Sequence, residues 1–357
     1  MKKLLKYHAS LWRNLFLAAA GLGLAISGCR KDVPIPDSSD AGNISFKVPQ
    51  GWPAPFYNFE GNTLSNAKFV LGRRLFYDTR LSADNLVSCG TCHQSFAAFA
   101  NADHALSHGV NEKLGKRNSP ALFNLNWHTS FMWDGGINHL EVQPLAPITN
   151  PVEMDEKLDN VLSKLQADTK YQQLFRDAYG TPEVTSERMF KAMAQFMGLM
   201  VSDQSKYDKY MRKEAGVSLS AAELAGLEVF QQKCATCHKA PLFTDFSYRN
   251  KGLAVTALND SGRATITLDA ADLYKFKVPT LRNLKYTAPY MHDGRYSTLN
   301  QVLDQMQHGI VASPTLDPLM KDGIALTDAE KSNLLAFLNT LNDETFVKDK
   351  RFFEPQP

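Results

Sequence analysis

The sequence Cys-x-x-Cys-His occurs twice in this chain of 357 residues, at positions 89–93 and 234–238. Two thiols three positions apart, followed at once by a histidine, form the attachment sequence for a c-type haem. The thiols bind the haem vinyl groups covalently, and the histidine lies under the macrocycle as the proximal iron ligand. Two copies in a chain with only one other cysteine predict two covalently bound haems. The predicted haem-binding residues are Cys89, Cys92 and His93 for one haem and Cys234, Cys237 and His238 for the other.

The Cys-x-x-Cys pairs have two alternative uses. They could form a zinc site or a redox dithiol. A zinc site built from both pairs would leave His93 and His238 as coincidences, and an exported thiol pair more often forms a disulfide. The haem interpretation is therefore preferred.

The N-terminus has the layout of an export signal. Residues 1–13 are basic and residues 15–26 are apolar and rich in small side chains. This apolar run is short for a membrane span. It ends in Ile-Ser-Gly-Cys, which resembles the lipobox at which bacterial lipoprotein signals are cut, so Cys29 would become a lipidated first residue. The alternative is an ordinary signal with an unrelated cysteine.

Removal of residues 1–28 leaves a nearly neutral protein. This segment holds four basic residues and no acidic ones, so the 39 lysines and arginines of the chain become 35 against 37 acidic residues. Nothing in this balance indicates binding to nucleic acid.

The rest of the chain divides into a tether and two domains. Residues 29–55 are rich in Pro, Ser, Asp and Gly, which is typical of a linker. The remaining length suits two domains, which we expect at 56–205 and 206–357. Apolar residues at helical spacing predict helices over 66–76, 158–165 and 188–201, and capping boxes at 220–223 and 327–330 predict two more helix starts. No run alternates as a strand does, so both domains are predicted to be mainly α.

An internal repeat supports this division. Residues 120–135 match residues 279–294 without a gap, and each block lies downstream of one Cys-x-x-Cys-His. The simplest explanation is a tandem duplication of a cytochrome c domain. Trp133 stands where the second block has His292. This tryptophan could fill the core, as tryptophan usually does, or could shorten an electron path between two haems.

A methionine is expected as the second axial ligand of the C-terminal haem. Met306 follows His238 at a spacing like that of the axial methionine in small c-type cytochromes, and it lies in a predicted helix over 298–307. A thioether ligand favours ferrous iron and raises the reduction potential. Met291 and Met320 are rival candidates, since most methionines only fill the core.

These motifs resemble the bacterial dihaem cytochrome c peroxidases and the related dihaem enzymes of methylamine utilisation. The resemblance runs from about residue 67 to residue 341. It rests on both attachment sequences and on the stretches GKRNSP (115–120), FMWDGG (131–136), VPTLRN (278–283) and TAPYMHDG (287–294).

The resemblance implies a role for each haem. The N-terminal haem, on His93, would be the peroxide site, and the C-terminal haem, on His238 and Met306, would be the electron-entry site. Trp133 would be the tryptophan between the haems.

The resemblance also implies a distal glutamate, and Glu153 stands at the matching position. Cleavage of bound peroxide requires a proton to move from the inner to the outer oxygen, which a carboxyl group can carry as base and then acid. Gln143 and Pro147 would line the same pocket. The alternative for Glu153 is an acidic residue at the start of the 158–165 helix, where it would favour the helix dipole.

Some members of the family hold a histidine on the distal face of the peroxidatic haem and release it when the other haem is reduced. His108 lies near the expected place, although it is one residue closer to His93 than expected and other members lack this histidine. His104 is the rival. Both could equally be histidines of a solvent-facing loop.

The family also has a calcium ion between its haem domains. The matching ligands are the Asn118 side chain and the backbone carbonyls of Thr287 and Pro289. Oxygen ligands with several waters suit calcium, and ligands from both halves would couple the ion to the domain geometry. Asn118 alone would be an ordinary turn residue.

The sequence thus predicts a lipid-anchored dihaem peroxidase on the periplasmic side of a Gram-negative bacterium. A small cytochrome c or a cupredoxin would donate electrons to the second haem, and hydrogen peroxide would be reduced to water at the first. Homodimers are common in the family. Two alternatives are a dihaem protein oxidase of the methylamine-utilisation type, which has a tyrosine where Met306 stands, and an electron carrier with both irons fully ligated.

Overall fold

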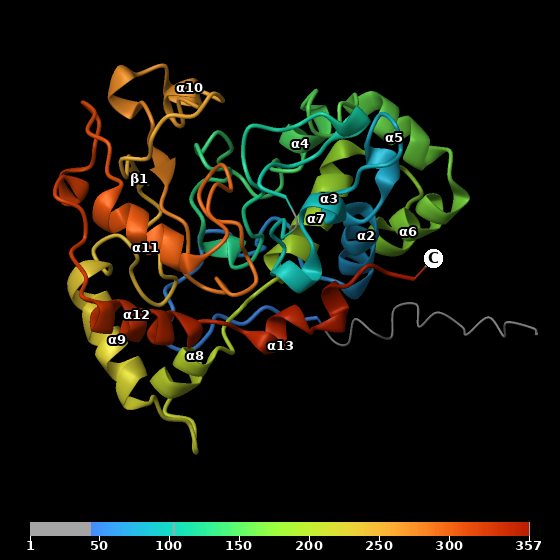
Figure 1. Ribbon diagram of the computed structural model, residues 1–357. Helices are drawn as coiled ribbons and strands as arrows, with labels where there is room; N and C mark the ends of the chain where they lie inside the picture. The colour runs from blue at the N-terminus through green and yellow to red at the C-terminus, as the bar shows by residue number, and fades with distance from the viewer. Residues whose placement is uncertain (1–43, 103, 357) are drawn as a thin grey trace, which may run out of the picture. The chain divides into compact units, whose positions relative to one another are not determined.

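The computed structural model describes residues 44–102 and 104–356 (Figure 1). The predicted export signal, the lipidated Cys29 and most of the predicted tether lie outside the described residues. Within the described part of the chain, no helix is both long enough and apolar enough to cross a membrane.

The described chain is mainly helical, as predicted. The α-helices are α2 (Asn66–Phe76), α3 (Cys89–Cys92), α4 (Leu145–Thr149), α5 (Leu158–Gln166), α6 (Thr169–Tyr179), α7 (Ser186–Gly198), α8 (Lys206–Met211), α9 (Ala221–Lys233), α10 (Ala264–Thr267), α11 (Leu299–His308), α12 (Asp328–Asn339) and α13 (Glu344–Val347). The short helix η8 (Lys350–Phe352) follows α13. Two short strands, β1 (Tyr248–Arg249) and β2 (Phe276–Lys277), pair antiparallel with Tyr248 opposite Lys277.

The helix ends follow local capping chemistry. The predicted helix over 66–76 is confirmed as α2, whose first turn is capped by the Ser65 side chain. The capping boxes predicted at Ser220 and Thr327 are present at the starts of α9 and α12. The helix predicted over 188–201 begins two residues earlier, because Thr185 caps it, and ends at Gly198.

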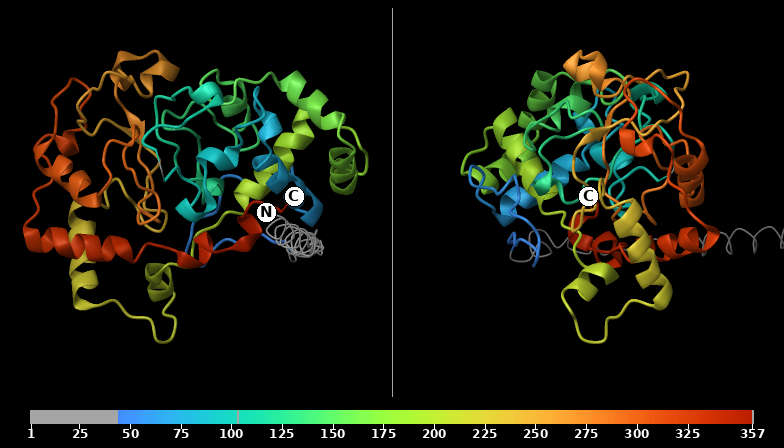
Figure 2. Two further views of the ribbon diagram at one scale, coloured as in Figure 1. Left: turned by 45° about the vertical axis from the view of Figure 1, so that its right-hand side comes forward. Right: turned by 90° about the vertical axis from the view of Figure 1, so that its left-hand side faces the viewer.

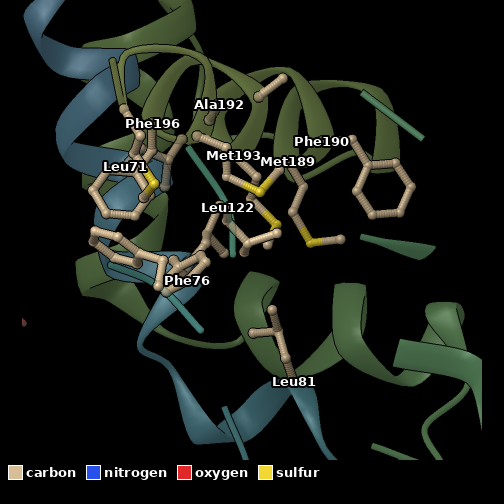
Figure 3. Close-up of a cluster of buried hydrophobic side chains, with 14 of the residues drawn as sticks. Leu71, Phe76, Leu81, Leu122, Met189, Phe190, Ala192, Met193 and Phe196 are labelled. Atoms are coloured by element: carbon tan, nitrogen blue, oxygen red, sulfur yellow. The ribbon is translucent and has the colours of Figure 1, made fainter. Parts of the chain in front are cut away.

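The first hydrophobic core forms where α2 crosses α7. Figure 3 shows Leu71 and Phe76 of α2 facing Ala192 and Phe196 of α7. A Cβ atom on Gly72 would collide with the backbone carbonyl of Ala192, so the two helices approach this closely only with glycine at this position.

The second core repeats this arrangement where α9 crosses α12, as Figure 2 shows. Its centre is formed by Phe230, Phe243 and Phe337. A Cβ atom on Gly226 of α9 would collide with the backbone of Asn333 of α12. In each half, therefore, a helix that precedes Cys-x-x-Cys-His crosses a later helix at a glycine, which is consistent with the predicted duplication.

The segment 344–352 returns to the first core, and Figure 1 shows the chain running there from α12. Phe346, Val347 and Phe352 are buried among the residues of that core. The hydroxyl of Tyr77 donates a hydrogen bond to the carbonyl oxygen of Phe352, 2.7 Å away and 275 residues along the chain. The boundary at 205/206 stays a prediction, and this segment of the second predicted domain packs in the first core.

Candidate haem-binding cavity

A cavity of about 1230 Å³ is lined by both halves of the described chain. The two attachment sequences open onto it. The lining includes Cys89, Cys92, His93, Cys234, Cys237 and His238. All six predicted haem-attachment residues therefore face one continuous space.

The state of the thiols argues against the two alternatives for the Cys-x-x-Cys pairs. None of these four cysteines forms a disulfide. Burial raises the pKa of Cys89 to about 12 and that of Cys92 to about 11, whereas a reactive dithiol has a lowered pKa. Among the described residues, no group of three or more His, Cys, Asp or Glu side chains could hold a metal ion. The four thiols are therefore not gathered at one point in the described part of the chain.

The predicted proximal histidines share one hydrogen-bonding arrangement. Nδ1 of His93 lies 2.8 Å from the carbonyl oxygen of Phe99, and Nδ1 of His238 lies 3.1 Å from that of Phe243. A carbonyl only accepts, so Nδ1 carries the proton in each case and Nε2 is left free for a metal. Burial lowers the pKa of both histidines to about 4, which keeps their imidazoles neutral, as iron ligation requires.

Glu153 lies in the cavity wall on the side of the first attachment sequence. Its charge acts on the thiols of Cys89 and Cys92. Burial raises its pKa and outweighs the opposing effects of a 2.8 Å hydrogen bond from Asn150 Nδ2 and of the Arg117 charge. Gln143 and Pro147 line the same cavity.

The alternative role for Glu153, as the acidic residue that starts a helix, is wrong. Helix α5 begins only at Leu158, and the acidic residue in its first turn is Asp159. Glu153 is held instead by its backbone, whose carbonyl accepts a hydrogen bond from the N–H of Val110 at 2.7 Å. The carboxyl group of Glu153 therefore belongs to the cavity wall, and it does not lie in the first turn of a helix.

Trp133 lines the cavity and is fixed by residues from both halves. Its indole Nε1 donates a hydrogen bond to the carbonyl oxygen of Asn118 at 2.9 Å. Its own carbonyl accepts a hydrogen bond of 2.8 Å from the backbone N–H of Lys277. The N–H of Asn118 donates to the carbonyl oxygen of His292, the repeat counterpart of Trp133, at 2.7 Å. The backbone of one residue, Asn118, therefore joins the two equivalent positions of the repeat.

His108 lies at the edge of the cavity. Its side chain is 39% exposed, and its Nδ1 is 3.5 Å from a carboxylate oxygen of Glu112. Its ring centroid is 4.4 Å from that of His104. The structure thus brings both candidate histidines together in one loop, and ligation of iron by His108 stays a prediction.

The three candidate methionines, Met291, Met306 and Met320, all line the cavity. Met306 lies on α11, whose start is fixed by a capping box at Thr298. The sulfur of Met291 accepts a hydrogen bond from Lys251 Nζ. Met306 has no such partner among the described residues, which leaves its thioether available as a ligand.

The predicted calcium ligands also lie together along the cavity. Asn118, Thr287 and Pro289 all contribute to its lining. The amide nitrogen of Asn118 donates to the backbone carbonyls of His104 and Ala105, at 3.2 and 3.1 Å. This arrangement leaves the amide oxygen of Asn118 as a hard donor atom of the kind that calcium prefers.

Sequence reasoning missed the charged residues inside the cavity. Arg117 binds Asp260 through two hydrogen bonds of 2.6 and 2.8 Å and also pairs with Asp134, which ties the two halves together. Burial lowers the pKa of Lys277 to about 7 and that of Lys251 to about 8. Arg117 lies in the GKRNSP stretch and Lys277 lies among aromatic and apolar neighbours in Tyr274–Val278, but neither pattern showed that these charges line the cavity.

Comparisons with known proteins identify the family of this chain. The family described as di-haem cytochrome c peroxidase matches residues 66–216. The methylamine utilization protein MauG of Methylorubrum extorquens is 36% identical over 309 residues, which cover 84% of each chain. The chain belongs to the di-haem cytochrome c peroxidase family. Membership implies two c-type haems, which fits a cavity that both attachment sequences face.

Other relatives in this family carry the name of a peroxidase. The cytochrome c551 peroxidase of Nitrosomonas europaea is 31% identical over 296 residues, covering 81% of this chain and 84% of that protein. Among solved structures, a MauG-like protein associated with microbial copper homeostasis has a TM-score of 0.79 and 31% identity, covering 87% of this chain and 99% of that one.

Proposed function

We propose that this protein is a dihaem peroxidase that reduces hydrogen peroxide to water with electrons from a small cytochrome c or a cupredoxin. The observation that carries the proposal is a single cavity faced by both haem-attachment sequences, with the buried carboxyl group of Glu153 and the available thioether of Met306 in its wall. The relatives named as cytochrome c peroxidases support it.

At the first site, His93 would ligate the haem iron. Glu153 would act as the acid–base group where peroxide binds. A haem bound there supplies the coordination position for peroxide and the electrons that reduce it. Because burial raises its pKa, Glu153 binds a proton more readily than an exposed glutamate and can take up and return one during the reaction. His108 would occupy the distal position in the resting protein.

At the second site, His238 and Met306 would ligate the iron. A methionine ligand raises the reduction potential and suits a haem that accepts single electrons from a soluble donor. Trp133 would lie on the path to the first site. Calcium held by Asn118, Thr287 and Pro289 would fix the geometry between the two sites.

We also propose a place in the cell envelope. Cys29 would carry a lipid, so the haem domains would be tethered to a membrane on the periplasmic side. The basic segment 1–13, the apolar segment 15–26 and the Ile-Ser-Gly-Cys sequence at its end support this location.

A second candidate function is oxidation of tryptophans on a partner protein, as the resemblance to methylamine-utilisation enzymes suggests. The 36% identity with a MauG protein favours it. Met306 argues against it, because that type has a tyrosine at this position.

A stopped-flow titration tests these functions. Peroxide is mixed with the fully oxidised protein and with the protein reduced by one electron, in the presence of a reduced small cytochrome c. Turnover only after reduction supports a peroxidase gated by His108, and the His108→Ala variant should then be active without reduction. Turnover of both forms supports the peroxidase without this gate. No reaction of either form contradicts the peroxidase and favours an electron carrier.

A further inference from the structure

Lys251 is a basic residue that lies inside the protein and opens onto the haem cavity. It follows strand β1, and the backbone on both sides of it is fixed. The side chain of Asn250 donates to the hydroxyls of Ser313 and Thr315, each at 2.9 Å, and its oxygen accepts from the N–H of Gly252, also at 2.9 Å. The lysine side chain is therefore directed into the cavity by a rigid loop.

The ammonium group of Lys251 lacks an anion of its own. Its hydrogen-bond acceptor among the described residues is the sulfur of Met291, at 2.5 Å, which is a weak and uncharged acceptor. The nearby carboxylate of Asp293 is held by Arg295, with both oxygens 2.9 Å from the arginine Nε. A buried cation in this position is costly unless an anion accompanies it.

Lys251 lies on the side of the second haem site. The carbonyl oxygen of its neighbour Gly252 accepts a hydrogen bond of 3.4 Å from the side chain of Gln305, which precedes Met306, and His238 lines the same cavity. Lys277 provides a contrast within the same cavity. Its Nζ donates to the carbonyl oxygen of Ser130 at 2.6 Å, and its charge acts on His128 in the first half. Of these two lysines, Lys277 thus has a carbonyl oxygen as acceptor in the first half, whereas Lys251 has only a sulfur in the described part of the chain and lies on the side of the second haem site.

We propose that Lys251 binds a propionate carboxylate of the second haem and raises the reduction potential of that haem. A haem bears two carboxylates, which are the kind of anion that the ammonium group lacks. A positive charge close to the iron favours the ferrous state, which has one positive charge less than the ferric state. The inference rests on the second haem site of the proposed function and adds to the effect expected from Met306.

Spectroelectrochemical titration of the full protein tests this inference. The variant Lys251→Met keeps the apolar stem and removes the charge, and Lys251→Arg keeps the charge. Lys239→Met, at an exposed lysine next to His238, is the matched control for loss of one positive charge. We expect Lys251→Met to lower the potential of the methionine-ligated haem by about 59 mV, a tenfold change in its electron-exchange equilibrium constant. The other haem, Lys251→Arg and Lys239→Met should stay close to the wild type.

An unchanged potential in Lys251→Met, or an equal shift of both haems, would overturn the inference. Resonance Raman bands of the propionates give a second readout and should shift in Lys251→Met but not in Lys239→Met. If Lys251→Met does not take up its second haem, Lys251→Gln replaces it in both measurements. A wild-type protein without a methionine-ligated haem would contradict the proposed function itself, whereas a normal wild type with no effect at Lys251 would contradict this inference alone.

Discussion

The indole Nε1 of Trp133 donates a hydrogen bond to the carbonyl oxygen of Asn118, 2.9 Å away. The side-chain oxygen of the same Asn118 is the predicted calcium donor, and its N–H binds the carbonyl of His292. The proposed electron path and the proposed calcium site therefore share one residue.

Trp133→Phe should slow electron transfer between the haems while leaving peroxide binding intact. Phenylalanine keeps the aromatic bulk, but it is harder to oxidise than tryptophan and cannot bind the Asn118 carbonyl. Stopped-flow reduction of the protein should show the first haem becoming reduced several-fold more slowly. Trp127→Phe, at a buried tryptophan that does not line the cavity, is the control. Equal rates in Trp133→Phe and the wild type would remove Trp133 from the path.

Glu153→Gln should lower kcat/KM for peroxide by about 100- to 10,000-fold, the usual contribution of a general acid–base group. Burial raises the pKa of Glu153 above its ordinary value of 4.5, so wild-type activity should fall as the pH drops through this raised pKa. The variant should lose that limb of the pH profile. Asp155→Asn, at a surface carboxylate paired with Lys113 at 3.2 Å, should keep it.

The same pKa shift makes a prediction about stability. The folded-state pKa of Glu153 lies above the unfolded value, so the stability it contributes is present at low pH and is lost as the pH rises through the folded-state pKa. Urea unfolding at neutral pH should therefore find Glu153→Gln at least as stable as the wild type. A clearly less stable variant would mean that the carboxylate has a stabilising partner.

Removal of either cysteine pair should remove one haem. Cys89→Ala with Cys92→Ala leaves the second attachment sequence intact, so covalent haem should fall from two per chain to one. Haem staining after denaturing electrophoresis and a pyridine haemochrome assay measure this. The reciprocal change at Cys234 and Cys237 should leave the other haem. Retention of both haems in either variant would contradict the assignment.

Arg282→Met should destabilise the fold by about 3–5 kcal/mol, because it leaves a buried carboxylate without its partner. The guanidinium of Arg282 binds both oxygens of Asp208, at 2.6 and 2.8 Å, and both side chains are almost fully buried. Adding Asp208→Leu should restore part of the loss in urea unfolding. Lys348→Met, which removes an exposed ion pair with Glu344, should have little effect.

The pH dependence of this pair has the opposite sign to that of Glu153. Burial acts to raise the pKa of Asp208, but the hydrogen bonds and charge of Arg282 outweigh it and lower the pKa. The stability that the pair contributes is therefore present above the unfolded pKa of aspartate and lost as the pH falls through the folded-state value. In Arg282→Met this acid-side loss should shrink.

Calcium removal should weaken the coupling between the two haem sites. Equilibrium dialysis should find one tightly bound calcium in the wild type and none in Asn118→Ala. Magnesium should not replace it, because it demands a smaller octahedral site. Equal calcium binding by the variant would exclude Asn118 as a ligand.

Local signals predicted much of this fold. Both ends of helix α2 could be predicted correctly, because its capping residue and its apolar spacing lie within a dozen positions of the sequence. The capping boxes that start α9 and α12 could also be predicted from the sequence, because each lies within four consecutive residues. The repeat also aligned Trp133 with His292, and the backbone of Asn118 hydrogen-bonds to both residues.

Other features depend on contacts between distant segments, and the sequence alone could not supply them. Nothing in residues 344–352 indicates that Phe346 and Phe352 pack beside Phe99. Lys251 has no anion of its own among the described residues because Arg295 binds the carboxylate of Asp293. This pairing depends on the folded geometry, and no sequence pattern indicates it.

The return of residues 344–352 to the first core has a consequence for biogenesis. Phe346, Val347 and Phe352 are part of the packing around α2 and α7, so the half that carries the first attachment sequence is incomplete while the ribosome is still making the second. Until this segment is in place, the apolar surface that Phe346, Val347 and Phe352 cover is open, so the first half is completed only after the rest of the chain is present.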